Sequence, residues 1–208
     1  AEAMQSLTKL DLFKMKYYNF EIGTFAGVEN VIVSATGYTG SGGFEIYFKN
    51  DNAEKIWNAV FKAGEKFGIK PIGLAARDTL RLEMGYCLYG NDINDTTSPI
   101  EAGLGWITKF TKDFVNAEEI KKQKVEGISK KLVAFKMVDK GIPRHDYVIK
   151  NTAGDAIGIV TSGTQAPSLG KAVGLGYVAT AHAAVDSDIY IDIRNTLVKA
   201  KVVKFPFK

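Results

Sequence analysis

The chain has 208 residues, of which 46% are hydrophobic and 24% charged, the balance of an ordinary globular protein. Its net charge of +4 is too small to indicate nucleic-acid binding by itself, although it would suit an acidic partner or an anionic ligand. No segment approaches the roughly 20 apolar residues of a membrane-spanning helix, and the single cysteine, Cys87, excludes an internal disulfide and indicates a reducing compartment.

The first part of the chain is predicted to begin with strands and an amphipathic helix. Short strands are expected at residues 20–22 and 31–34, and residues 44–48 have the two-residue alternation of a half-buried strand. A helix is expected over residues 53–67, because its apolar side chains recur on one face and Gly68 stands where a C-terminal glycine cap belongs.

Two further helices are expected before the chain changes character. One covers residues 74–84, between Pro71 and Gly85. The other is rich in lysine and is expected to begin at Asn116, because Asn116 and Glu119 have the spacing of a capping box. We interpret this lysine-rich helix as the junction between two domains.

The remaining residues are predicted to be all-β. Short β-rich runs alternate with turn residues, which favours a small barrel or sandwich. The expected strands are KLVAFKMV, DYVIK, AIGIV, AVGLGYV, DIYIDI and LVKAKVVKF, and the expected breaks are DKGIP, NTAGD, TSGTQAPS and RN. The predicted fold class is therefore α+β: an antiparallel sheet with helices, followed by a C-terminal six-stranded β-barrel or jelly-roll-like domain. The expected boundaries are an α+β segment at 1–110, a helical linker at 111–127 and the barrel at 128–208.

The stretch TGYTGSGGFEIYF, residues 36–48, is the first candidate for a functional site. A phosphate loop or a dinucleotide fingerprint would need a helix after its glycines, whereas a predicted strand follows here. The pattern therefore favours a glycine-rich turn that enters a strand. Glu45 in this strand is either solvated or an acceptor for a ligand with adjacent N–H donors, which a carboxylate can bind with two oxygens.

The segment GLAARDTLRLEMGYCLYGNDI, residues 73–93, is the second candidate. Asp78 can pair with Arg81 at i+3, which favours a surface helix with paired charges. The alternative is that Arg77 or Arg81 is held for an anionic or π-rich ligand. Cys87 has no histidine nearby in the sequence and is interpreted as a buried, inert thiol.

Three other features leave alternatives open. Trp106 is either a core residue or a flat wall for an aromatic ligand. No metal site is expected, because His145 and His182 lack spaced carboxylate or cysteine companions. Spacing alone leaves a Ser-His-Asp arrangement open, but neither histidine lies near a G-x-S-x-G motif. The lysines of residues 109–131 and 199–208 are most simply solvated, with a docking surface for an acidic partner as the alternative and nucleic acid third.

Four motifs taken together resemble a known family. In chain order, TGYTGSGGFEIYF, GLAARDTLRLEMGYCLYGNDI, TTSPIEAGLGW and VTSGTQAPSLGKAVGLGYV are similar to the aminomethyltransferase (T-protein) family of the glycine cleavage system. The resemblance runs from about residue 10 to residue 207. LEMGYCLYGND distinguishes the chain from folate-binding iron–sulfur maturation relatives, which carry K-G-C-Y-x-G-Q-E. No flavin domain is seen, unlike in the related demethylating dehydrogenases.

The resemblance implies a tetrahydrofolate-dependent aminomethyltransferase. Such an enzyme moves the one-carbon unit of an aminomethyl group on the lipoyl arm of H-protein to tetrahydrofolate and releases ammonia. The resemblance assigns folate contacts to Tyr38, Glu45, Arg77 and Trp106, with Glu45 on the N–H groups of the pterin edge. Tetrahydrofolate as co-substrate and lipoylated H-protein are the implied partners, with no metal, nucleic acid or membrane. The implied compartment is the bacterial cytoplasm, in preference to the mitochondrial matrix.

The chain departs from the family pattern in two ways. Family members are much longer, and their catalytic aspartate lies in an upstream part that no residue here matches, so no catalytic residue is assigned. We expect the chain to be a C-terminal fragment with little or no activity alone, and its uncovered apolar face to promote self-association. The tail FPFK also lacks the tyrosine with which family members often contact folate. The alternatives are a non-catalytic folate-binding module and an H-protein docking piece, the latter through Lys121, Lys122 and Lys124.

Overall fold

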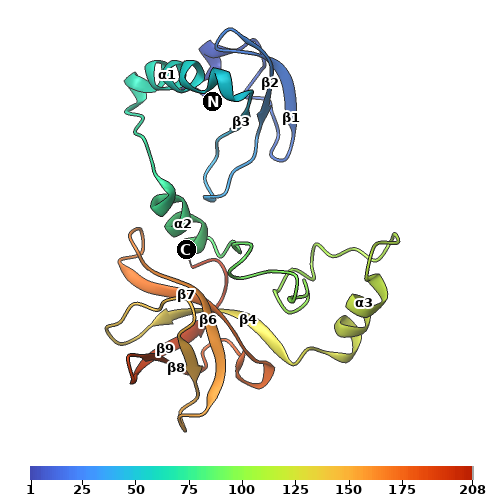
Figure 1. The fold of residues 1–208 in the computed structure, drawn as a ribbon, viewed down its shortest axis with the longest axis vertical. Coiled ribbons are helices and arrows are strands. Elements are labelled where there is room, and N and C mark those ends of the chain that lie inside the picture. Colours follow the sequence, from blue (N-terminus) through green and yellow to red (C-terminus); the bar gives the residue numbers. More distant parts are fainter. Residues whose placement is uncertain (208) are drawn as a thin grey trace. The chain divides into compact units, whose positions relative to one another are not determined.

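The computed structural model describes residues 1–207 and divides into two compact units (Figure 1). The first unit is Ala1–Arg77, and the second begins at Asp78 and includes the rest of the described chain. Within those 207 residues, no helix has both the length and the apolar character needed to cross a bilayer.

The first unit is a three-stranded antiparallel sheet with a helix on one face (Figure 1). Its core is formed by buried apolar residues of the sheet and the helix, joined by Leu12: Phe25, Val31, Val33 and Ile56. Two short 3₁₀ helices, η1 and η2, precede β1 and α1. The elements are η1 (Gln5–Leu7), β1 (Phe20–Phe25), β2 (Val28–Ser34), β3 (Glu45–Tyr47), η2 (Asn50–Asn52) and α1 (Ala53–Gly64), with the strands in the order β1-β2-β3.

The opposite face of this sheet is apolar and exposed. Ile22, Ile32 and Tyr47 are directly opposite one another across the three strands, and Phe20 lies on the same face two residues before Ile22. Phe20, Ile22 and Tyr47 keep 61%, 59% and 52% of their surface exposed. The two-residue period of the strands thus buries one row of side chains under α1 and leaves the other row in solvent.

The predicted glycine cap at the end of the first long helix is confirmed. α1 tightens into a 3₁₀ turn, η3 (Glu65–Phe67), and Gly68 follows in the left-handed conformation with φ +69°. Its N–H donates to the carbonyl of Glu65, which satisfies a carbonyl at the helix end. The apolar face of the helix is only partly buried, because Ile56 is in the core whereas Trp57 is 56% exposed.

The capping box predicted at Asn116 is wrong, although a helix does begin there. α2 covers Leu74–Glu83, close to its expected span, and α3 covers Ala117–Glu126. Asn116 is the residue before α3, but it has φ +65° and its side chain makes no capping hydrogen bond. A side-chain cap needs the extended conformation at this position, and the left-handed backbone removes that geometry.

The second unit contains a closed barrel of six antiparallel strands, as predicted (Figure 1). Its order around the barrel is β4-β7-β6-β5-β8-β9, and β9 pairs back with β4. Phe135, Ile149, Val160, Ile189 and Ile191 are fully buried in its core. The elements are β4 (Lys130–Met137), β5 (Val148–Lys150), β6 (Ala156–Ala166), β7 (Lys171–Ala179), η4 (Thr180–His182), β8 (Asp188–Ile193) and β9 (Thr196–Val203).

The break predicted at TSGTQAPS is wrong over its first six residues, because β6 continues to Ala166. Thr161 is the extra residue of a bulge, since Val160 pairs with Gly176 and Ser162 pairs with Leu175. The hydroxyls of Thr161 and Ser162 are buried and donate to the carboxylate of Asp92. The sequence pattern predicted a turn at these hydroxyl residues, but they continue the strand because Asp92, outside the strand, accepts the hydrogen bonds of their hydroxyl groups.

Candidate functional site

Glu45 lies at the end of the glycine-rich stretch, which the structure confirms as a turn that enters a strand. Glu45 is the first residue of β3 and pairs with Ser34 at the end of β2. The Thr36 hydroxyl donates to Glu45 Oε2 and lies 3.1 Å from Ser34 Oγ. Because Gly40 has φ +72°, the loop makes a reversal that a residue with a β-carbon adopts only with strain. The carboxylate is thus half-buried and held by one hydroxyl.

Tyr38 and Arg77 form the second part of the site, and the structure brings these two predicted residues together. Tyr38 lies in the loop between β2 and β3, and Arg77 lies in the first half of α2. The guanidinium carbon of Arg77 is 4.4 Å from the centre of the Tyr38 ring, within the range of a cation–π contact. Stacking occupies one face of the guanidinium and leaves its N–H edge for an acceptor.

Trp106, the fourth predicted residue, belongs to the second unit. It is 73% exposed, so the alternative that it is a core residue is wrong. Its carbonyl accepts a hydrogen bond of 2.7 Å from Lys109 Nζ. The indole ring is therefore a free apolar surface of the kind that an aromatic ligand or a partner can cover.

Arg81 forms a buried network that the sequence analysis missed. Arg81 is 1% exposed and Asp92 is fully buried, so the expected surface helix is wrong at this position. Arg81 Nη1 lies 2.6 Å from Asp92 Oδ2, and Arg81 Nη2 lies 2.6 Å from Asp78 Oδ1, which confirms the predicted i+3 pair. The remaining donors of Arg81 reach Asp78, the Tyr86 carbonyl and Ser162 Oγ.

The Arg81 guanidinium thus has a partner for each of its five N–H groups. Burial alone would lower the pKa of Arg81, but the charges of Asp92 and Asp78 outweigh it and raise the pKa above its ordinary value. One signal in the sequence indicates that Arg81 is buried, because Arg81 lies between two leucines, Leu80 and Leu82, in the predicted helix. The acceptor Ser162, 81 residues away, gave no such signal.

Two further features concern the thiol of Cys87 and the side chains that could bind a metal. Burial, with a smaller contribution from the charge of Asp92, raises the pKa of Cys87 to about 11, so the thiol stays protonated at neutral pH. Among residues 1–207, no three His, Cys, Asp or Glu side chains are grouped to hold a metal ion.

Comparison with known families accounts for both parts of the chain. Residues 1–112 match the family model described as the GCVT N-terminal domain, and residues 130–208 match the glycine cleavage T-protein C-terminal barrel domain. The chain belongs to the glycine cleavage T-protein family. The predicted α+β sheet and six-stranded barrel are the fold of this family, as the solved relative described below shows.

Individual T-protein relatives agree with this assignment. The chain is 69% identical over 207 residues to an aminomethyltransferase of Flavobacterium psychrophilum, and 60% identical over 208 residues to one of Bacteroides thetaiotaomicron. These matches cover 100% and 99% of the chain, but only 58% of each relative. The chain therefore spans somewhat over half the length of the curated T-proteins that it matches.

A solved T-protein has the same fold. The crystal structure of the glycine cleavage system aminomethyltransferase T from Bartonella henselae matches with a TM-score of 0.85 and 30% identity. The match covers 94% of this chain and 54% of the solved chain.

Proposed function

We propose that this chain is the tetrahydrofolate-binding part of an aminomethyltransferase. The whole enzyme would move the one-carbon unit from aminomethyl-lipoyl on H-protein to tetrahydrofolate and release ammonia. Two observations carry the proposal, in a chain whose relatives are aminomethyltransferases. Glu45 is a half-buried carboxylate at the end of the glycine-rich stretch, and Tyr38 of the same stretch stacks with Arg77.

Glu45 is proposed to bind the adjacent N–H groups of the pterin. The Thr36 hydroxyl restrains the carboxylate by donating to one oxygen. An ionised carboxylate has about four acceptor positions, so both oxygens keep capacity for ligand donors. Two parallel N–H bonds to one carboxylate fix the plane of a flat ring as well as its position.

Arg77 and Tyr38 are proposed to contact the rest of the folate. The stacked pair combines a fixed positive charge with an aromatic surface. Folate has carboxylates that suit the first and aromatic rings that suit the second. Trp106 is proposed as a further aromatic contact, because its ring is exposed.

We assign these residues to binding and none to the chemical step. The chain alone is proposed to have little transfer activity, because it spans 58% of its relatives and none of its residues matches the aspartate that the family resemblance assigns to catalysis. The family matches at 1–112 and 130–208 support the proposed domain boundaries near residues 110 and 128. The bacterial relatives support a bacterial rather than a mitochondrial origin, with the cytoplasm as the proposed compartment.

Calorimetric titration of reduced tetrahydrofolate into the 208-residue chain tests the binding proposal. Glu45→Gln should weaken binding by about tenfold to a hundredfold, the effect of losing hydrogen bonds to a charged group. Glu21→Gln is the matched control, because Glu21 is exposed on β1 and points to the other face of the same sheet. Equal affinity of wild type and Glu45→Gln would refute the assigned role of Glu45.

The enzymatic part of the proposal is tested on the whole parent protein. Supplied with lipoylated H-protein carrying the aminomethyl group and with tetrahydrofolate, it should release ammonia. No release under these conditions would leave the non-catalytic folate-binding module as the remaining function.

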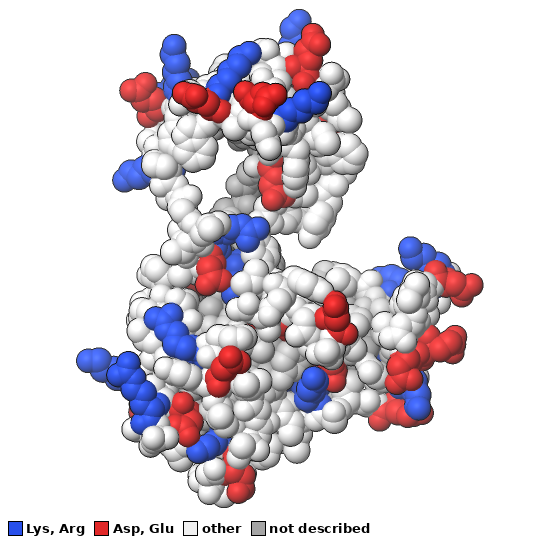
Figure 2. All heavy atoms as spheres, viewed as in Figure 1, with Lys and Arg blue, Asp and Glu red and all other residues white. Residues whose placement is uncertain are grey.

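The docking alternative finds less support. Lys121 and Lys122 of α3 are exposed. The helix also contains Glu118, Glu119 and Glu126, which balance the charge of its three lysines. Figure 2 likewise shows positive and negative side chains interspersed on the face in view. Replacing Lys121, Lys122 and Lys124 with glutamate should therefore leave H-protein binding by the parent protein intact, and lost binding would favour docking through α3.

A further inference from the structure

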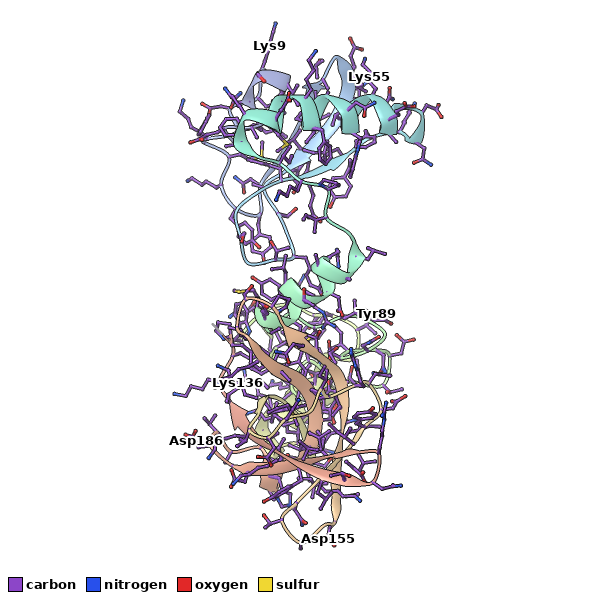
Figure 3. The ribbon with its side chains drawn as sticks, turned by 90° about the vertical axis from the view of Figure 1, so that its left-hand side faces the viewer. Lys9, Lys55, Tyr89, Lys136, Asp155 and Asp186 are labelled. Atoms are coloured by element: carbon purple, nitrogen blue, oxygen red, sulfur yellow. The ribbon has the colours of Figure 1, made fainter. Side chains whose placement is uncertain are left out.

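A polar cleft lies against the barrel, and none of the residues assigned to folate lines it. It has a volume of about 530 Å³ and is enclosed by the loop after α2, the start of β4 and parts of β6 and β7. We call it the Lys130 cleft, and the lining residues that matter here are Asn91, Lys130, His145, Asp146, Thr161 and Tyr177. In Figure 3, Tyr89 is labelled in the loop that continues to Asn91, and Asp155 is labelled just before β6, whose first half also lines the cleft.

The floor of the Lys130 cleft is fixed by buried hydrogen bonds. Thr161, the extra residue of the β6 bulge, donates its hydroxyl to Asp92 at 2.5 Å. The Tyr177 hydroxyl donates to the Asp92 carbonyl at 2.9 Å. Because Asp92 also accepts from Arg81, the loop that carries Asn91 is attached to the barrel wall by a fully buried carboxylate. The backbone of this wall is therefore already ordered before a ligand binds, which lowers the entropy cost of binding.

Among the described residues that line the cleft, Asp146 is the single carboxylate, and its side chain is 74% exposed. His145 Nδ1 lies 2.7 Å from the Thr161 carbonyl, so this nitrogen carries the proton. His145 Nε2 lies 3.3 Å from Asp146 Oδ1. Asp146 therefore faces the imidazole, and within residues 1–207 it forms no ion pair with Lys130.

Lys130 supplies a positive charge that no carboxylate neutralises within residues 1–207. Its ammonium lies 5.2 Å from the centre of the Tyr177 ring, and the side chain is only partly exposed. The neighbouring Asn91 side chain is also partly buried and makes no hydrogen bond within the described chain. The cleft thus offers a cation, Lys130, and a side-chain amide donor, Asn91, neither of which has an acceptor within residues 1–207, and both can donate to an anion.

We propose that the Lys130 cleft binds a small ligand through an anionic oxygen group, a carboxylate or a phosphate. Lys130 provides the opposite charge and Asn91 provides a neutral hydrogen-bond donor. The Tyr177 ring contacts the ammonium of Lys130 through a cation–π interaction. This site is independent of the proposed function, because it uses none of Tyr38, Glu45, Arg77 or Trp106.

Nuclear magnetic resonance titration of the ¹⁵N-labelled 208-residue chain tests this site. Sodium phosphate and sodium acetate are added in separate series, with sodium chloride at equal ionic strength as the blank. Saturable shifts are expected at the amides of Asn91 and Lys130 and at the His145 imidazole. Saturation by one anion and not the other identifies which of the two chemistries the cleft accepts.

Two substitutions and a matched control complete the test. Lys130→Gln should weaken binding by about tenfold or more, since a charged hydrogen-bond donor is lost. Lys131→Gln removes the same charge from the next, exposed residue of β4 and should leave binding unchanged. If Lys130→Gln fails to fold, Asn91→Asp serves instead, because it places a second carboxylate in the cleft and should abolish binding. Shifts that chloride reproduces, or that survive these cleft substitutions, would overturn the proposal.

Discussion

Replacing Asp92 with alanine is expected to destabilise the barrel unit by about 3–5 kcal/mol, the cost of removing one partner of a buried ion pair. The Asp92 carboxylate accepts hydrogen bonds from Arg81, the Leu88 N–H, Thr161 and Ser162. Its loss leaves Arg81, which is 1% exposed, with a buried charge paired only to Asp78. Water cannot easily replace the carboxylate there, so the cost is far larger than for an ion pair in solvent.

Asp192→Ala is the control for this prediction. Asp192 pairs with Lys150 at 2.8 Å, nearly the same distance, but the two side chains keep 19% and 28% of their surface exposed. A pair that solvent screens contributes about 1 kcal/mol or less. Native-state hydrogen exchange on the amides of β4 and β7 gives the opening free energy of the barrel for each variant. If Asp92→Ala and Asp192→Ala lower it by the same amount, burial is not what makes the Asp92 network important.

Three further outcomes are expected. Because burial raises the pKa of Cys87 to about 11, its alkylation by iodoacetamide at pH 8 should be far slower in the native chain than in urea, and similar rates would contradict a buried thiol. The hydrogen bond from Lys199 is the main cause that lowers the pKa of Asp188 below its ordinary 3.8. This stabilising contribution is present above that value and is lost as pH falls through the folded-state pKa. The thermal midpoint of Asp188→Asn should therefore fall less steeply below about pH 4 than that of wild type, and equal slopes would show that the pair does not act on stability. The exposed apolar sheet face should cause self-association, and Ile22→Asp should reduce it in sedimentation velocity. A wild-type chain that stays monomeric at all concentrations would refute this.

Local patterns predicted most of the secondary structure, because the interactions behind them span few residues. The apolar period over residues 53–67 and the cap at Gly68 depend on contacts within one or two helical turns, and both are present in α1 and η3. The six runs of the second half likewise became the six strands of the barrel. Where a local pattern allowed two backbone conformations, as at Asn116, the prediction of a side-chain cap was wrong.

The candidate site was predictable only in part. The spacing around Glu45 identified a turn that enters a strand, and the order of four motifs identified the family. Composition and periodicity left Glu45, Arg77 and Trp106 each with two interpretations. The contact of Arg77 with Tyr38 joins residues 39 positions apart, so no local pattern contains it.

The amino-acid sequence by itself determined the family, the class of fold and the approximate position of each strand. Tertiary structure alone decided that Arg81 is buried, that Thr161 and Ser162 continue β6, and that a polar cleft forms beside them. The physical reason is common to all three. A charged or hydroxyl side chain is stable in the interior only when a partner satisfies it, and here the shared partner, Asp92, lies about 70 residues away in the chain from the strand that it holds.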